Sequence, residues 1–304
     1  MPNRALLGGL SVGAGLPVVV LGVLNVGPES FYRGSVASDP DQLLRMAEKM
    51  VEAGAAVLDV GAMSTAPYLP GRIAEGEETD RLSRAVRLLV EKLGVPISAD
   101  TTRAAPARAA LDAGATIIND VSGVSADSEM AELVARRGAA LILTASPGVG
   151  ASRVQSVPPA RPSSAPSVAV RERPEQVVFA RLGQSLALAR RAGIAREGIV
   201  VDPGIGFFRD SGWPWQEWDC RVLARLGELH RLEQPICVGV SRKSFIGAIL
   251  GEEDPGRRLV GSLAATAVAV ANGADLIRTH DVGETIGAVR IAEAIRAAGF
   301  SGTA

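Results

Sequence analysis

The sequence predicts an α/β protein folded as a (β/α)8 TIM barrel, in which parallel strands close into a ring surrounded by helices. Short runs of apolar and β-branched residues alternate with longer segments rich in Ala, Leu, Glu and Arg. The apolar runs are nearly uninterrupted, as in parallel strands that are buried on both faces. The length of 304 residues fits one such barrel, so we expect residues 1–304 to form a single domain.

Eight predicted strands alternate with eight predicted helices, which is the order of a parallel barrel. The strands cover residues 18–26, 55–60, 96–100, 116–119, 139–144, 198–202, 235–240 and 274–279. The helices cover residues 40–53, 76–93, 104–113, 127–137, 174–192, 217–231, 258–272 and 283–297. A glycine follows most of these helices, where a left-handed residue leads the chain into the next strand.

Two segments lie outside this alternation. Residues 5–17 are rich in glycine and predict a short hairpin that plugs the bottom of the barrel. Residues 145–173 are rich in Pro, Ser, Gly and Arg, and we expect a long flexible loop there, after the fifth strand. A lid over the site and an insertion without a function both fit this composition.

Composition and charge exclude several classes of partner. Lys and Arg total 32 and Asp and Glu total 33, so the net charge of −1 gives no basic field for nucleic acid. No run of apolar residues is long enough to span a membrane, and no signal peptide pattern opens the chain. Cys220 and Cys237 lack the spacing of a metal or redox motif, which indicates reduced thiols in a cytoplasmic protein.

Polar residues stand at nearly every predicted strand end. The active sites of such barrels form at the carboxyl ends of the strands, so these residues predict a binding mouth. Some of them could be ordinary turn or capping residues. The set comprises Asn25, Asp59, Ser64, Thr65, Asp100, Asn119, Thr144, Asp202, Ser241, Lys243, Arg278 and His280.

Four of these residues suit the edge of a flat heterocycle. Asp100, Asn119, Asp202 and Lys243 offer acceptors, an amide and a cation, which match an aminopyrimidinone. We also expect a buried carboxylate beside Lys243 to stay ionised through charge pairing.

A second group suits phosphate oxygens. Asn25, Ser64, Thr65, Arg278 and His280 offer neutral donors and positive charge. The amide of Asn25 could also bind Mg²⁺, which prefers oxygen ligands.

Seven segments, taken in order, resemble the motifs of dihydropteroate synthases over about residues 18–296. Residues 24–31 (LNVGPESF) resemble the family's LNVTPDSF, and residues 59–65 (DVGAMST) resemble DIGGEST. The strongest matches are residues 202–207 (DPGIGF) and 241–247 (SRKSFIG). The remaining three are residues 100–101 (DT), 119–121 (NDV) and 278–282 (RTHDV).

The resemblance implies a transferase of folate biosynthesis. Enzymes of this family condense 6-hydroxymethyl-7,8-dihydropterin diphosphate with p-aminobenzoate and release diphosphate. By the same motifs, Asp100, Asn119, Asp202 and Lys243 would hold the pterin. Anionic Asp100 and Asp202 would also stabilise the cationic methylene left when diphosphate departs.

The resemblance also implies roles on the diphosphate and arylamine sides. Arg278 would lie against the pterin and reach the diphosphate with His280, and Asn25 would bind Mg²⁺ beside it. We therefore expect the catalytic groups to be Asp100, Lys243, Arg278 and His280. Ser64 and Thr65 would lie near the diphosphate and the arylamine. Ser241 would meet the arylamine carboxylate, and Phe207 would wall its pocket.

The loops differ from the family pattern mainly on the arylamine side. Residues 66–68 read Ala-Pro-Tyr where Arg-Pro-Gly is usual, and residues 143–144 read Leu-Thr where Met-His is usual. Residues 62–63 read Ala-Met in place of Gly-Glu, and Gly27 and Glu29 replace Thr and Asp in the first loop. The acceptor could therefore be p-aminobenzoate or a related, larger arylamine.

Two other functions compete with the synthase. A pterin-dependent corrinoid methyltransferase would share the barrel and the acidic pterin site, but it would not need the diphosphate-directed Arg278 and His280. A non-catalytic pterin-binding barrel would account for the altered loops. We expect a homodimer formed through the last helices, as is common in the family, although core packing explains the apolar residues 262–272 nearly as well.

Overall fold

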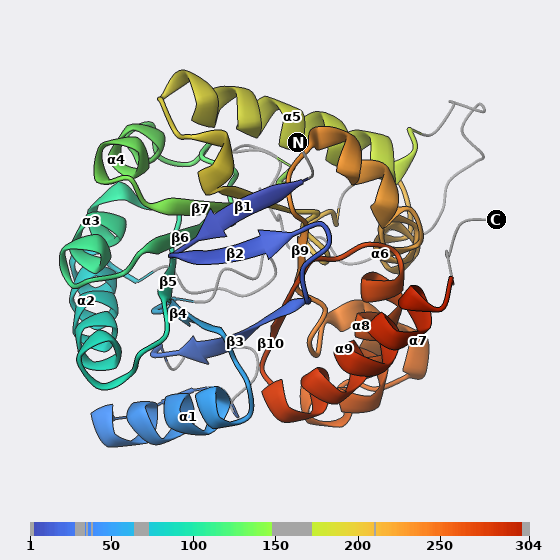
Figure 1. Cartoon of the computed structure of the whole chain (residues 1–304), viewed down its shortest axis with the longest axis horizontal. Coiled ribbons are helices and arrows are strands. Elements are labelled where there is room, and N and C mark those ends of the chain that lie inside the picture. Colours follow the sequence, from blue (N-terminus) through green and yellow to red (C-terminus); the bar gives the residue numbers. More distant parts are fainter. Residues whose placement is uncertain are drawn as a thin grey trace, which may run out of the picture.

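Eight parallel strands form a nearly closed barrel with helices around it, as the sequence predicts (Figure 1). The computed structural model describes residues 3–27, 34, 36–37, 39–63, 73–147, 172–209 and 211–299. The strands are β3 (Val19–Asn25), β4 (Val57–Gly61), β5 (Ile97–Asp100), β6 (Ile117–Asp120), β7 (Ala140–Thr144), β8 (Ile199–Asp202), β9 (Cys237–Val238) and β10 (Leu276–Thr279).

The ring of strands runs in the order β8-β7-β6-β5-β4-β3-β10-β9. The two ends of this order meet where Val201 forms an isolated parallel bridge with Ile236. At the same point the Val201 N–H donates to the Pro235 carbonyl at 2.9 Å. This contact joins β8 to the segment that leads into β9, so the sheet curls into a barrel instead of ending in two open edges.

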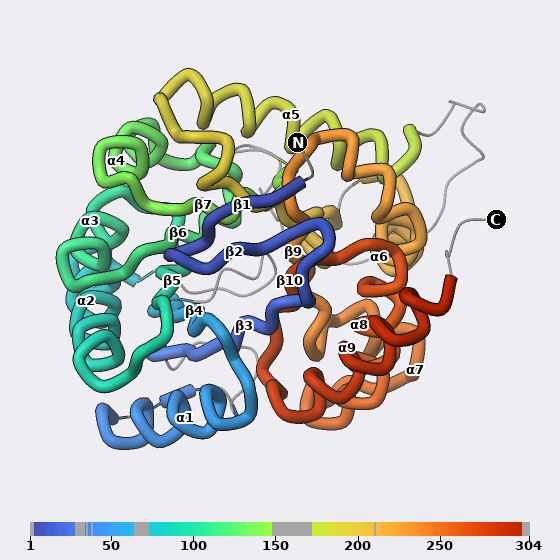
Figure 2. Tube along the Cα trace, viewed as in Figure 1, coloured from blue at the N-terminus to red at the C-terminus, as the bar shows by residue number. Residues whose placement is uncertain are grey.

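Helices surround the strands on all sides in the view down the barrel (Figure 2). They are α1 (Pro40–Glu52), α2 (Glu75–Lys92), α3 (Ala104–Asp112), α4 (Met130–Arg137), α5 (Pro174–Arg191), α6 (Trp215–Ala224), α7 (Ser244–Leu250), α8 (Leu259–Ala271) and α9 (Val282–Ala297). Short 3-10 turns add η2 (Arg196–Gly198), η3 (Leu226–Leu232) and η4 (Pro255–Arg257). No helix among these is long and apolar enough to cross a membrane.

The predicted hairpin closes one end of the barrel. β1 (Arg4–Leu7) and β2 (Leu10–Gly13) pair antiparallel and lie across the ring of strands in Figure 1. Ala5, Leu7 and Val12 are buried against the starts of the barrel strands, among them Val57 and Ile117. Since those residues mark the amino ends of the strands, the hairpin plugs the end of the barrel that is opposite the predicted site.

Most boundaries agree with the sequence prediction to within two residues, and the larger differences concern four elements. α7 was not predicted, because SRKSFIG was assigned to a strand end and the turn that follows it. The helix predicted at 217–231 is α6 followed by the 3-10 turn η3. α4 begins at Met130 and not at residue 127, since the Asp127 carboxylate instead accepts a bond from the Ala104 N–H at 2.7 Å. β9 spans only Cys237–Val238, where residues 235–240 were expected.

The loop expected at residues 145–173 lies almost wholly outside the described residues. Ala145, at its start, is buried and its N–H donates to the Asp202 carbonyl at 2.8 Å. The expected flexibility of this loop and the single-domain assignment of the whole chain stay predictions.

Candidate active site

Polar side chains occupy the last inward-facing positions of the barrel strands. Side chains alternate along a strand, so residues two apart face the same side. Val57, Ile117, Val200 and Leu276 belong to the buried cluster that faces the hairpin. Two residues further along the same strands come Asp59, Asn119, Asp202 and Arg278. Each strand therefore fills the barrel with an apolar residue first and presents a polar one at its carboxyl end.

Strand register brings several of these residues to one level. Asp100 on β5 is the register partner of both Gly61 on β4 and Asn119 on β6. Gly61 is in turn the partner of Asn25 on β3. The parallel pairing thus collects Asn25, Asp100 and Asn119 from separate parts of the chain, as the sequence predicts.

Arg278 connects the two groups that the sequence suggested. Its Nε donates to Asp59 Oδ2, and its Nη2 donates to Asp100 Oδ2. The Asn119 side-chain amide donates to the same Asp59 oxygen at 3.1 Å. Arg278 thus lies directly against Asp100, one of the residues expected to hold the pterin.

The two carboxylates that contact Arg278 are buried, and only some of their oxygens form hydrogen bonds. Asp59 is 0% and Asp100 is 5% exposed. Within the described part of the chain, the Oδ1 atoms of both carboxylates have no hydrogen-bond partner. Buried polar atoms are nearly always paired, so these oxygens indicate a place where a ligand supplies N–H donors.

Burial and charge set the ionisation of this group. Burial raises the pKa of Asp100 to about 7, because loss of hydration outweighs the attraction of Arg278. Asp59 and Asp100 raise the pKa of Arg278 against the effect of its burial, so the guanidinium stays charged.

Lys243 lies against the DPGIGF segment. Its Nζ donates to the Ile205 carbonyl at 2.6 Å and lies 4.9 Å from the centre of the Phe207 ring. Gly206 has a φ of +85°, and a Cβ built on it would lie 3.2 Å from Lys243 Cδ. Burial lowers the pKa of Lys243 to about 8, with Asp202 partly opposing the shift. Glycine at this position therefore gives the lysine room to lie in the site.

The sequence predicted that charge pairing keeps a buried carboxylate beside Lys243 ionised, but at Asp202 the effect of burial on the pKa is larger than that of the lysine. Burial raises the pKa of Asp202, and the N–H of Gly204 and the charge of Lys243 only partly offset that effect. The Gly204 N–H donates to Asp202 Oδ1 at 2.8 Å. The backbone of the following turn, more than the lysine, therefore stabilises the charged carboxylate.

Ser241 and His280 contact each other at the neighbouring tips of β9 and β10. Ser241 Oγ lies 2.9 Å from His280 Nδ1, and the His280 backbone N–H donates to Ser241 Oγ at 3.2 Å. Burial, together with the positive charge of Arg278, lowers the pKa of His280 to about 3. His280 is therefore neutral at physiological pH and offers a hydrogen bond, where the sequence suggested positive charge.

Asn25 is the predicted magnesium ligand, and it ends β3 at the mouth of the barrel. A neutral amide can supply one oxygen to a hard cation. Over the described ranges no three His, Cys, Asp or Glu side chains gather in a way that could hold a metal.

Two predicted residues, Ser64 and Thr65, lie outside the described residues. Two further residues lie in the site: Asp59, which the sequence placed at the mouth without a specific role, and Arg209, which it did not consider. Asp59 is the deepest acid under Arg278, and its signal was a lone carboxylate within the buried strand Val57–Gly61. Arg209 donates from Nη2 to Ser244 Oγ, next to Lys243, and stacks on Trp215 at 4.0 Å from the ring centre.

Comparison with known proteins agrees with this geometry. The family model described as "Pterin binding enzyme" matches residues 21–280. The dihydropteroate synthase of Synechocystis sp. is 35% identical over 91% of this chain and 89% of its own length. A probable bifunctional folylpolyglutamate synthase/dihydropteroate synthase of Haloferax volcanii is 38% identical over 91% of this chain, which spans only 30% of that longer protein.

A solved structure extends the similarity to three dimensions. The dihydropteroate synthase of Coxiella burnetii in complex with pteroic acid superposes with a TM-score of 0.80 at 30% identity. The match covers 97% of this chain and 99% of that one. The barrel, the acidic residues at its mouth and these similarities agree, and the chain belongs to the dihydropteroate synthase family of pterin-binding enzymes.

Proposed function

We propose that this enzyme condenses 6-hydroxymethyl-7,8-dihydropterin diphosphate with p-aminobenzoate, or with a related arylamine, and releases diphosphate in folate biosynthesis. The observation that carries this proposal is the arrangement of Arg278 over Asp59 and Asp100. It combines a cation for a diphosphate with buried acceptors for ring N–H groups.

Pterin binding begins with exchange of partners at the carboxylates. The N–H groups of the pterin edge donate to the carboxylates of Asp100 and Asp59. The side-chain amide of Asn119 and the carboxylate of Asp202 form further hydrogen bonds with the pterin. Arg278 then turns its guanidinium toward the ring face and the diphosphate. Lys243 approaches the ring from the DPGIGF side, where it already lies against Ile205 and Phe207.

The chemical step breaks the carbon–oxygen bond to diphosphate and forms a carbon–nitrogen bond to the arylamine. Arg278 places positive charge beside the departing oxygens, and neutral His280 donates a hydrogen bond to them. In their ionised forms, Asp100 and Asp202 stabilise the methylene cation, whose charge spreads into the ring. The amine nitrogen becomes acidic as it bonds and releases its proton, so a strong base is not required.

Magnesium is proposed as the cofactor, held by the amide oxygen of Asn25 and by the diphosphate. When bound, Mg²⁺ would supply additional positive charge for the leaving group. Ser64 and Thr65 are proposed near the diphosphate and the arylamine on the basis of their motif. Ser241 and Phe207 are proposed for the arylamine side of the site.

The test is turnover by the purified chain with the pterin diphosphate, Mg²⁺ and p-aminobenzoate or larger arylamines. We expect diphosphate and a pteroate-like product in equal amounts, and loss of both in Arg278→Ala. Arg136→Ala is a matched control, since Arg136 is exposed and pairs with Glu132 on the same helix. Background release with every arylamine would overturn the proposal, and pterin binding without release would identify a non-catalytic binder.

The homodimer expected from the sequence is also part of the proposal. Large exposed apolar side chains gather on α7, α8 and α9, which contact one another in sequence order on one side of the barrel (Figure 1). They are Ile249, Leu250, Val260, Val268, Ile291 and Ile295. A second copy of the chain would remove this apolar surface from water. The cytoplasmic location stays a prediction that cell fractionation can test.

A further inference from the structure

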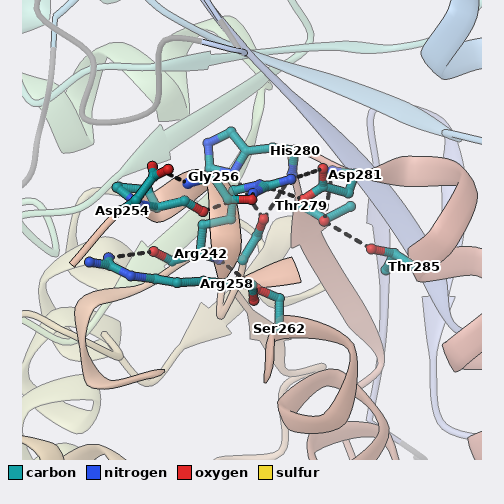
Figure 3. Close-up of polar contacts among 11 residues, drawn as sticks. Arg242, Asp254, Gly256, Arg258, Ser262, Thr279, His280, Asp281 and Thr285 are labelled. Atoms are coloured by element: carbon teal, nitrogen blue, oxygen red, sulfur yellow. Dashed lines mark hydrogen bonds and ion pairs between the residues drawn. The ribbon is translucent and has the colours of Figure 1, made fainter. Parts of the chain in front are cut away.

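Arg242 stands between the site residues Ser241 and Lys243 in the sequence, and the contacts of its side chain connect several segments around the site. The residue is 4% exposed, and its guanidinium forms a two-pronged ion pair with Asp281 (Figure 3). Nε donates to Asp281 Oδ2 at 2.9 Å, and Nη2 donates to Oδ1 at 2.7 Å. This planar, bidentate geometry is the strongest form of an arginine–carboxylate contact.

The partner of Arg242 is also next to a site residue. Asp281 directly follows His280, so the ion pair connects the segment after β9 to the segment after β10. The Asp281 N–H donates to Thr279 Oγ1 at 3.1 Å, and that hydroxyl lies 2.9 Å from Thr285 Oγ1 on α9. The Asp281 end of the pair is thus itself fixed to the start of the last helix (Figure 3).

The Arg242 backbone is held in an uncommon conformation. Its φ is +56°, in the left-handed region that side-chain-bearing residues seldom adopt. Its N–H donates to Ser262 Oγ at 2.8 Å, and its carbonyl accepts from Arg258 Nη1 at 3.2 Å. Backbone strain of this kind persists only where the surroundings determine it strongly.

The third nitrogen of Arg242 fixes the loop before α8. Nη1 donates to the carbonyls of Pro255 and Gly256, each at 2.8 Å. Every guanidinium nitrogen is therefore bonded to protein in a fixed direction. The side chain joins three segments, namely the tips of β9 and β10 and the turn η4.

We propose that the Arg242–Asp281 pair is a positioning device that fixes the tips of β9 and β10 relative to each other. Through it, Ser241 and His280 keep the geometry in which they meet the arylamine and the diphosphate. This inference rests on the proposed function. Arg242 and Asp281 are positioning residues, because they act on substrate only through their neighbours.

The test compares two conservative variants, Asp281→Asn and Arg242→Lys, with the wild type. Each keeps the approximate size of its side chain but loses the bidentate ion pair. We expect kcat/KM for the pterin diphosphate to fall about 100-fold, as for a misplacement of catalytic groups of about 1 Å. The double variant should be no worse than either single one, because both substitutions remove the same contact.

A second measurement distinguishes misplacement of Ser241 and His280 from a general loss of structure in the variant. Binding of 6-hydroxymethylpterin, which lacks the diphosphate, depends on Asp100, Asn119 and Asp202 on other strands. It also depends on Lys243, whose contacts with Ile205 and Phe207 do not involve the Arg242–Asp281 pair. We expect its Kd to change less than about threefold, whereas a merely structural defect would weaken both ligands together. Asp112→Asn is the matched control, since it removes an arginine–aspartate pair on the exposed surface and should leave kcat/KM unchanged.

Each outcome decides the inference. Folded variants that keep at least half of the wild-type kcat/KM would overturn it, as would equal loss of affinity for both ligands. Loss of helical circular dichroism in both variants would show that the pair serves folding, which also overturns it. Absence of turnover in the wild type would instead contradict the proposed function, so the two failures are distinguishable.

Discussion

Arg278 on β10 donates to Asp59 on β4, and β3 lies between these two strands in the barrel. Asp59 is fully buried, whereas Arg278 is 20% exposed. The pair therefore places a fixed negative charge beneath a cation that reaches toward the mouth of the barrel. Removal of one partner would leave the other charge buried and less well compensated.

Substitution Asp59→Asn keeps the shape of the side chain and removes its charge. We expect the free energy of unfolding to fall by about 3–5 kcal/mol, the usual effect of breaking a buried ion pair. Urea denaturation measures this change. The control is Asp112→Asn, which removes the ion pair between Arg137 and Asp112. These side chains are 39% and 54% exposed, so the expected change is about 0–1 kcal/mol. Equal effects of the two substitutions would show that the buried pair has no special role.

Substitution Gly206→Ala should displace Lys243. An added Cβ would lie 3.2 Å from Lys243 Cδ, on a residue with a φ of +85°. Gly212 provides the control, since its φ is +74° and nothing lies within 4 Å of a Cβ added there. Both variants should lose about 1–2 kcal/mol of stability from backbone strain.

Only Gly206→Ala should also weaken pterin binding, by about tenfold, because only there does the ammonium group move from its contacts. Isothermal titration calorimetry with the pterin would measure the difference. The same Kd in both variants would remove Lys243 from the pterin site.

His280 should stay neutral far into the acidic range. The chain has 2 histidines, so a proton NMR titration gives two ring signals, and His280→Gln identifies which belongs to His280. We expect its pKa near 3, against an ordinary value of 6.5.

The low pKa of His280 has a defined effect on stability. Between about pH 3 and 6.5 the unfolded chain binds a proton that the folded chain excludes, so the His280 contribution to stability falls as pH falls through that window. The unfolding free energy of His280→Gln should therefore depend less steeply on pH there. A midpoint near 6.5 in the wild type would contradict the proposal that His280 meets the diphosphate as a neutral donor.

The dimer depends on the apolar surface of α7, α8 and α9. Val260 is 78% and Ile291 is 64% exposed, and we expect Val260→Glu combined with Ile291→Glu to produce a monomer. Leu188→Glu, at a 38% exposed position on α5, should leave the dimer intact. Light scattering after size-exclusion chromatography gives both masses. A wild-type monomer would end the dimer proposal.

The strands and their polar ends could be predicted from sequence because each signal is local. An apolar run that ends in Asp100 or Asn119 is visible in a few residues, and the parallel order then brings their carboxyl ends together. The helix Ser244–Leu250 could not be predicted in this way, because seven residues carry too little periodicity and the preceding SRK was assigned to a strand end.

The partners of the site residues could not be predicted, because they depend on closure of the ring. Nothing near Arg278 in the chain indicates that it reaches Asp59, 219 positions away. The low pKa of His280 likewise arises from burial and from three cations that the fold collects around it. The sequence could indicate which residues meet at the mouth, but not which of them neutralise one another.

Because the β1–β2 hairpin covers one end of the barrel, ligands can reach the site only from the other end. Ala5, Leu7 and Val12 seal the end opposite the mouth with apolar side chains, so no ligand passes along the axis. When a site has one opening, the ligand that binds deeper has to enter first. In the proposed reaction, a pterin bound at the buried Asp59 and Asp100 would therefore enter before the arylamine.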